Sequence, residues 1–230
     1  MYEIKVICKK INHSIPNFYY NRLHGYISSL LGNEKYGKMG NDYTYSNILG
    51  GFWTKDGLCF DKDVPHFLIR TNNEVVLQNF LNNLKEHREM FEGLVVEKFS
   101  FRKLDLNQSR FRTLSVSPII LKRYGNTNRY LNKNELEISE KTLVENIRQK
   151  GKEENFNVDD NLSIKILREQ KQVTIGYRTL KKGCGGNEYI TLYHRGRVFD
   201  LDINCNSATK EFILTHGLGN ASSIGCGYII

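Results

Sequence analysis

The chain has 230 residues, and 40% of them are hydrophobic, which suits one large domain or two domains of roughly 100 residues each. Its formal net charge is +8, and 11% of its residues are aromatic. Basic and aromatic residues together serve single-stranded nucleic acid binding, because cations neutralise phosphates and rings stack on bases. A merely basic soluble protein would have the same composition, so composition leaves both interpretations open.

The five cysteines are scattered, and none forms a Cys-x-x-Cys pair, so we expect reduced thiols and no zinc site. The segment Met1–Lys5 carries charges where a signal peptide needs an apolar run. No stretch approaches the roughly 20 apolar residues of a membrane-spanning helix. We therefore expect a cytoplasmic protein that has no membrane partner.

In the first half, the hydrophobic periodicity predicts the order β-α-β-β-α-β. Residues Tyr2–Lys9 alternate as a strand does, and a helix with an apolar face runs from about Asn17 to Leu31. A second helix is expected over Val75–Met90. A β-like region is expected to open at Tyr43–Ser46, and the remaining strands are expected at Gly57–Phe60, His66–Thr71 and Gly93–Leu104. This order is that of a ferredoxin-like domain.

The second half follows a short polar linker, Asp105–Ser109, and repeats the pattern with one additional strand. Helices are expected over Ile138–Lys152 and Ser207–His216. Strands are expected at Thr113–Tyr124 (interrupted by Pro118), Leu162–Arg168, Gln172–Arg178, Glu188–Leu201 and Ile224–Ile230. The sequence therefore predicts an α+β fold of two tandem ferredoxin-like (βαββαβ) domains, residues 1–106 and 107–230.

The chain ends in a glycine-rich segment. The pairs Gly217-Leu218-Gly219 and Gly225-Cys226-Gly227 flank five residues that are mostly small or polar. Glycine tolerates positive φ and close backbone approach, so the segment suits a phosphodiester ligand or a tight contact between domains. A dinucleotide-binding fingerprint needs a strand before its glycines and a helix after them. Here the predicted order is reversed, which argues against a nucleotide cofactor.

This tail, Gly-Leu-Gly-(five residues)-Gly-Cys-Gly-Tyr, resembles the glycine-rich signature of the CRISPR-associated endoribonucleases that process repeat transcripts, members of the RAMP superfamily. Three other stretches agree with that family in order along the chain. They are Ile15-Pro16 followed by Tyr19, Tyr20, Leu23, Gly25 and Ile27; Tyr43-Thr44-Tyr45-Ser46; and Thr113-Leu114-Ser115-Val116-Ser117-Pro118-Ile119. The resemblance covers nearly the whole length of the chain.

The resemblance implies two tandem ferredoxin-like domains and a cut within the CRISPR repeat that needs no metal or other cofactor. The ribose 2′-OH would attack the adjacent phosphate and leave 2′,3′-cyclic phosphate and 5′-OH ends. The implied partners are CRISPR precursor RNA, mature guide RNA and other CRISPR effector subunits, with the chain a monomer or a homodimer. This chemistry needs a base, an acid and a cation for the phosphorane charge, and histidine suits the first two near neutral pH.

The family usually places its histidine on the first helix or in the loop that follows. The loop Asn33–Asp42 contains no histidine, and the nearest candidate is His24, at the border of the apolar stripe beside Tyr20. We take His24 as the general acid or base, with Tyr20 beside it and Lys38 as the phosphate cation. A partly buried structural histidine is the alternative. His216, which precedes the glycine-rich segment, is the second candidate, although a histidine at a helix end often serves the helix dipole instead.

RNA binding is expected to spread over both halves of the chain. In the first half, Ser28 and Lys35 flank the candidate site. The glycine-rich segment would contribute Gly217, Gly219, Asn220, Ser222, Ser223, Gly225 and Gly227. The cations expected to line a positive surface are Lys122, Arg123, Arg178, Lys181 and Lys182, with Arg129, Lys133, Arg195 and Arg197 nearby. Each basic cluster alone is more often a solvated face.

Three functions remain open at this point. The first is a repeat-specific endoribonuclease. The second is a non-cleaving CRISPR repeat RNA-binding protein of the same superfamily, which the missing loop histidine keeps possible. The third is a protein-interaction scaffold in which the glycine-rich segment only seats the two domains together.

Overall fold

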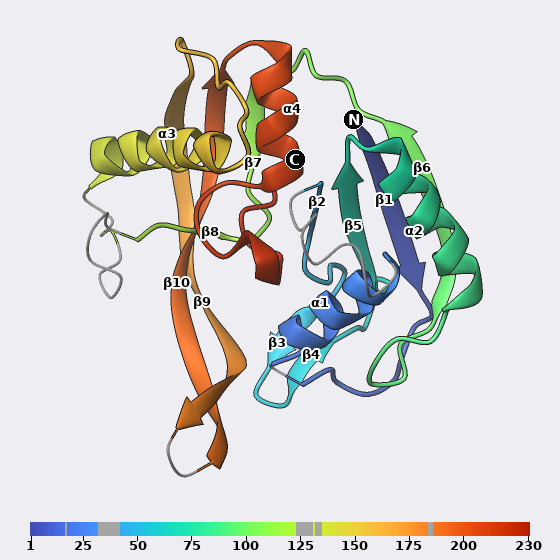
Figure 1. Cartoon of the computed structure of the whole chain (residues 1–230). Coiled ribbons are helices and arrows are strands. Elements are labelled where there is room, and N and C mark those ends of the chain that lie inside the picture. Colours follow the sequence, from blue (N-terminus) through green and yellow to red (C-terminus); the bar gives the residue numbers. More distant parts are fainter. Residues whose placement is uncertain (17, 32–41, 123–130, 132–134, 184–185) are drawn as a thin grey trace.

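The computed structural model describes residues 1–16, 18–31, 42–122, 131, 135–183 and 186–230, without the side chains of Ser223 and of residues 177–189. It contains two main antiparallel sheets, one in each half of the chain (Figure 1). No helix among these residues is long and apolar enough to cross a membrane.

The first sheet has the strand order β2-β5-β1-β6, and all its neighbours are antiparallel. Its strands are β1 (Tyr2–Cys8), β2 (Tyr43–Tyr45), β5 (His66–Thr71) and β6 (Val96–Lys103). The helices are α1 (Tyr20–Ser29) and α2 (Glu74–Glu86), and their apolar residues share one core with Ile4, Val6 and Cys8 of β1. Both helices therefore cover the same face of the sheet, and the predicted ferredoxin-like order of the first half is confirmed.

Two boundaries in the first half differ from the prediction. The stretch predicted as Gly57–Phe60 forms β4 (Gly57–Cys59), which pairs with β3 (Phe52–Thr54) in a hairpin separate from the main sheet. Helix α2 begins where the Asn73 side chain accepts the N–H groups of the first turn, and it ends at Glu86 rather than Met90. Beyond it, Glu89 pairs with Val95 across a turn that has positive φ at its tip, so the helix cannot continue.

In the second sheet, the central strand β10 (Gly186–Asn204) pairs with β7 (Arg110–Arg112) and β8 (Ile119–Ile120) along one edge and with β9 (Ser163–Gly183) along the other. Helices α3 (Leu136–Glu153) and α4 (Ser207–His216) pack on a second core that includes Phe199 and Leu201 of β10. The predicted bounds of α4 are confirmed. Figure 1 shows the β9–β10 hairpin extending well beyond the rest of its sheet.

Three strand predictions for the second half are wrong in extent. The two strands predicted at Leu162–Arg168 and Gln172–Arg178 form the single strand β9, which stays paired with β10 through two register shifts. The strand predicted at Thr113–Tyr124 is reduced to β8, because the chain turns at Leu114–Ser117, where the N–H of Ser117 donates to the carbonyl oxygen of Leu114.

The predicted final strand Ile224–Ile230 is also wrong. A 3₁₀ turn, η2 (Ser222–Ile224), comes first, and positive φ at Gly225 and Gly227 then turns the chain. Only the last residues pair: Ile230 and Arg112 exchange two backbone hydrogen bonds of 2.7 and 2.8 Å. The fourth strand of the second domain is thus reduced to a short pairing beside β7, and the ferredoxin-like order of this domain is preserved. We place the division between the domains at residue 106, between β6 and β7.

Buried polar contacts join the two halves. The carboxylate of Glu3 accepts hydrogen bonds from Arg70, Arg102 and Tyr228, and Arg70 also donates to the carbonyl oxygen of Ile229. Glu3 and Arg70 are 4% and 3% exposed, so this is an ion pair largely removed from water.

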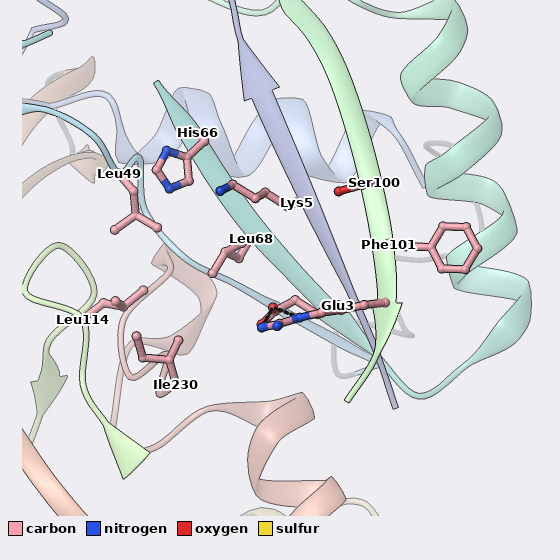
Figure 2. A pocket seen from close by; sticks show the side chains of 10 residues that line it. Glu3, Lys5, Leu49, His66, Leu68, Ser100, Phe101, Leu114 and Ile230 are labelled. Atoms are coloured by element: carbon pink, nitrogen blue, oxygen red, sulfur yellow. Dashed lines mark hydrogen bonds and ion pairs between the residues drawn. The ribbon is translucent and has the colours of Figure 1, made fainter. Parts of the chain in front are cut away.

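Beside this network, the sheet face opposite α1 and α2 borders a hollow of about 490 Å³. Figure 2 shows Lys5 and His66 on the sheet side of the hollow, and Leu114 and Ile230 of the second half across from Leu68. The C-terminal residue of the chain therefore lies against the first sheet.

Candidate active site

His24 lies on α1 and contacts the aromatic strand β2. Its Nδ1 is 3.2 Å from the hydroxyl oxygen of Tyr45, and the two rings are stacked with centroids 6.1 Å apart. Helix α1 buries Leu23 and Ile27 in the first core, so His24 falls at the border of the apolar face and is half-buried. The position predicted from helical spacing is confirmed.

The surroundings of His24 set its protonation. Burial lowers its pKa below the ordinary value of 6.5, so the imidazole is neutral at pH 7. Burial also raises the pKa of Tyr45 well above 10, so this phenol stays protonated. If the phenol donates to Nδ1, Nε2 carries the proton of His24 and acts as a donor. If Nδ1–H donates to the phenol, Nε2 holds the lone pair that a general base needs.

The glycine-rich segment lies with its backbone against other parts of the protein. Positive φ angles of 68–76° occur at Gly217, Gly219, Gly225 and Gly227. A Cβ atom on Gly219 would lie 2.6 Å from the carbonyl oxygen of Ile120, and one on Gly225 would lie 2.8 Å from the ring of Tyr45. Both the left-handed backbone and the close approach therefore require glycine at these positions.

Tyr45 connects His24 with this segment, because its hydroxyl contacts His24 and its ring edge lies against Gly225. The next residue, Cys226, is fully buried in the first core. From the same strand region, Asn47 Nδ2 donates to the carbonyl oxygens of Val116 and Gly225, at 2.8 and 3.3 Å. The candidate histidine and the glycine-rich segment thus meet through β2 and the residues that follow it.

The predicted neighbours of His24 lie on either side of it along α1. Tyr20, one turn earlier, is 4% exposed and stacks on Tyr19 with centroids 4.6 Å apart. Burial raises the pKa of Tyr20, so its phenol is a hydrogen-bond donor and not a base near neutral pH. Ser28, one turn later, is half-buried and hydrogen-bonds the phenol of Tyr43. The hydroxyl of Ser28 is therefore already engaged within the protein.

The polar residues of the glycine-rich segment have different roles in packing. The backbone N–H of Asn220 donates to the carbonyl oxygen of Ile120, and its Oδ1 accepts the N–H of Lys122 at 3.2 Å. Asn220 therefore fastens the segment to the end of β8 and brings Lys122 beside it. Ser222 is half-buried at the start of η2, where its carbonyl oxygen accepts the N–H of Gly225.

Several predicted site residues cannot be placed. Lys35, Lys38 and Arg123 lie outside the described residues, as do Arg129 and Lys133. For Arg178, Lys181 and Lys182 the structure describes the backbone in β9 but not the side chains, and the side chain of Ser223 is likewise not described.

The structure removes Arg197 from the expected positive surface. Its guanidinium forms a two-pronged ion pair with Glu169, at 3.0 and 2.8 Å, and donates to the hydroxyl of Ser139. Arg197 is 3% exposed, so it is a buried structural cation. The prediction that it contributes to RNA binding is therefore wrong, whereas its neighbour Arg195 is exposed.

His216 and His194 lie in protein surroundings of their own, away from a role in the site. His216, the second candidate, has Nδ1 2.7 Å from the carbonyl oxygen of Phe212 and Nε2 2.6 Å from a carboxylate oxygen of Glu154. Both of its ring nitrogens are thus occupied, as in a structural histidine. His194 is 7% exposed, and burial together with the nearby Lys122 lowers its pKa.

Sequence reasoning did not identify Tyr45 and Asn47 as parts of the site. Tyr45 stands in the aromatic-Thr-aromatic-Ser stretch that supported the resemblance, and its spacing from His24 gave no sign of contact. The available signal was an aromatic residue in a short strand directly after the candidate helix.

Comparison with models of protein families found no match, and comparison with curated protein sequences found none either. Solved structures do match along the whole chain. A Cas6-related protein from Pyrococcus furiosus has a TM-score of 0.73 at 16% identity, and an RAMP protein described as binding different RNA substrates has 0.70 at 19%. Both matches cover 99% of this chain and 97% of the other.

A CRISPR-associated protein Cas6 matches with a TM-score of 0.69 at 19% identity, over 100% of this chain and 97% of the other. At such identities the matches report on the fold. The chain therefore has the tandem ferredoxin-like fold of the CRISPR-associated RAMP proteins, which is the fold that the resemblance in its sequence predicted.

Proposed function

We propose that this protein is a metal-independent endoribonuclease of the CRISPR-associated RAMP superfamily, which cuts CRISPR precursor RNA within the repeat to give mature guide RNAs. The observation that carries the proposal is the contact of His24 with Tyr45, which joins the candidate catalytic helix to the glycine-rich segment. The fold and the sequence resemblance support it, and so does the net charge of +8, which favours a polyanionic substrate.

In this proposal the reaction is an internal transesterification. The 2′-oxygen bonds to the adjacent phosphorus as its proton passes to a base, and the bond to the 5′-oxygen breaks as that oxygen gains a proton. His24 supplies one of these transfers, because a neutral imidazole exposes either a lone pair or an N–H at Nε2. Lys38 and Lys122 neutralise phosphate charge, and Tyr20 donates a hydrogen bond.

The expected RNA contacts are divided between the two halves of the chain. Ser28 and Lys35 would act beside α1, and Asn220, Ser222 and Ser223 along the glycine-rich segment. The glycines would act by setting the course of that segment. Arg123, Arg178, Lys181 and Lys182 would neutralise phosphates further away.

A non-cleaving RNA-binding member of the same superfamily is the second candidate. The observation that favours it is that His24 is half-buried and already hydrogen-bonded to Tyr45, as a structural histidine would be. A scaffold role is the third candidate. The observation that favours it is that a Cβ atom on Gly219 or Gly227 would meet a backbone carbonyl oxygen, so the glycine-rich segment packs closely against the protein itself.

Incubation of the protein with the repeat RNA of its own host, in the presence of EDTA, distinguishes the three. The nuclease predicts a single cut that leaves a 2′,3′-cyclic phosphate. Tight binding without a cut indicates the non-cleaving protein. The absence of binding at low salt, where phosphate contacts are strongest, would leave the scaffold role.

A further inference from the structure

A second site lies where the two halves of the chain face one another beside α1. It is a pocket of about 610 Å³ between the beginning of α1, the β3 strand and the β9–β10 hairpin. Its lining includes Phe18, Tyr20, Phe52, Trp53 and Tyr193, together with Lys171. Aromatic rings from three distant parts of the sequence therefore line one cavity.

Three of these rings are largely exposed to solvent. Phe52, Trp53 and Tyr193 are 52%, 45% and 62% exposed, although the core would bury apolar rings of this size. Large exposed apolar groups gathered at one place mark a binding site more often than scattered ones do.

Contacts within the protein hold the aromatic rings of the pocket in place. Trp53 stacks on the fully buried Tyr19, with centroids 6.1 Å apart and planes 20° apart, which holds its ring in position. On the opposite wall, a Cβ atom on Gly176 would lie 2.9 Å from the ring of Phe18 and 3.0 Å from that of Tyr193. The glycine therefore lets both rings lie directly against β9.

The chemistry of the lining fits one class of ligand. Aromatic faces stack on nucleobases regardless of sequence, and a cation beside them neutralises the phosphate that accompanies each base. Lys171 is exposed and provides that cation, on a chain whose net charge is +8. A purely apolar peptide would gain nothing from this charge.

The position of the pocket connects it to the candidate active site. Tyr20 lines the pocket, and His24 follows it by one helical turn on the same helix, so their side chains are neighbours. We infer that this pocket holds an unpaired nucleobase of the RNA close to the phosphate that is cut, stacked between Trp53 and Tyr193. The inference rests on the proposed RNA-binding function and adds a base-holding site to it.

The protein contains its own reporter for this site, because Trp53 is its single tryptophan. A base that stacks on an indole quenches the indole fluorescence. We expect the emission of Trp53 to fall on titration with unlabelled repeat RNA at low salt, using the His24→Ala protein so that the RNA stays intact. The RNA concentration at which half of this emission change has occurred should match the one measured by fluorescence anisotropy with the same RNA carrying a dye.

Substitutions that keep the reporter test the pocket further. Tyr193→Ala should weaken RNA binding by about 5- to 150-fold, the range for losing one stacked base. Lys171→Gln should reduce the salt dependence of binding by about one charge. Phe101→Ala is the matched control, because Phe101 is a 55% exposed ring on β6 that does not line this pocket, and it should leave affinity unchanged.

The two proposals fail in different ways. Suppose that anisotropy shows RNA binding while the emission of Trp53 does not change, or while Tyr193→Ala binds RNA as tightly as the wild type. Either result would overturn the nucleobase pocket and leave the proposed RNA binding intact. No anisotropy change at low salt would overturn both. A change in Trp53 emission with protein concentration alone would show that a second copy of the chain occupies the pocket, and would overturn the nucleobase assignment.

Discussion

At the scale of single residues, the proposed chemistry depends on His24 and its contact with Tyr45. The sequence identified His24 because helical spacing placed it at the border of the apolar stripe of α1, where a side chain reaches a surface. Its partner could not be predicted, because the contact is made across 21 positions of sequence by the fold of β2 against α1. Periodicity describes one element at a time and does not report on which elements touch.

His24→Ala should lower the single-turnover rate of RNA cleavage by about 10²- to 10⁴-fold, the usual range for losing a general acid or base, while RNA affinity is retained. His13→Ala is the matched control, because His13 is exposed and its ring contacts the carbonyl oxygen of Glu92. An unchanged rate in His24→Ala would remove this residue from the mechanism.

The pH dependence of cleavage assigns the direction of proton transfer. Burial lowers the pKa of His24, so the neutral ring persists to pH values below 6.5. If His24 is the base, the rate should be level near neutral pH and fall only as the pH drops below about 6.5 and through the lowered pKa. A rate that instead rises as the pH falls through this range would contradict the base role and indicate that the protonated ring acts as the acid.

At the scale of elements, the helices and the main strands of the first sheet followed the hydrophobic pattern, whereas the predicted strands over residues 113–124, 162–178 and 224–230 of the second half did not. The middle of β9 is polar and mostly exposed around Arg168–Gln172, so the pattern indicated a break where backbone pairing with β10 in fact continues. The apolar run Ile224–Ile230 indicated a strand, because short apolar runs do not distinguish a strand from a loop inserted into a core. The positive φ at Gly225 and Gly227 decided between them.

The glycine-rich segment should tolerate no side chain at its closest approach. A Cβ atom on Gly227 would lie 1.9 Å from the carbonyl oxygen of Leu218, in a backbone conformation with φ of 76°. Gly227→Ala should therefore lower the free energy of unfolding by at least about 1–3 kcal/mol, measured by urea denaturation.

Gly25→Ala provides the contrast. Gly25 lies within α1 and a Cβ atom there would meet nothing within 4 Å, so the substitution should stabilise the protein by about 0.5–1 kcal/mol. Equal stability of Gly227→Ala and the wild type would show that the segment is free to move away, contrary to its packing in the structure.

At the scale of the whole molecule, the two domains are joined through Glu3, which receives hydrogen bonds from both halves. The tandem ferredoxin-like fold was predictable from the order of elements, but this joint was not, because it brings the third residue of the chain against Tyr228. The same holds for the aromatic pocket, whose walls come from three distant segments.

Glu3→Gln should lower the free energy of unfolding by about 3–5 kcal/mol, because it leaves the buried Arg70 without its counter-charge. Burial alone would raise the pKa of Glu3, but Arg70, Arg102 and Tyr228 outweigh it and hold this pKa below the ordinary 4.5. The stabilisation is therefore complete above the unfolded pKa and is lost as the pH falls through the lowered one.

Urea midpoints measured at neutral pH and at a pH below 4.5 check this, and the difference between wild type and Glu3→Gln should shrink in acid. Glu97→Gln, an exposed carboxylate on β6, should change stability by no more than about 0.5 kcal/mol. A gap between wild type and Glu3→Gln that does not depend on pH would refute the charge-based account of the joint.

The most direct test of the central claim compares two RNAs in the presence of EDTA. One is the repeat RNA, and the other is the same RNA with hydrogen in place of the 2′-OH just upstream of the cut. Cleavage by 2′-OH attack predicts a single cut with a 2′,3′-cyclic phosphate end in the first RNA and none in the second, with both bound equally. Cutting of the 2′-deoxy RNA, or tight binding of the repeat RNA without any cut, would contradict it.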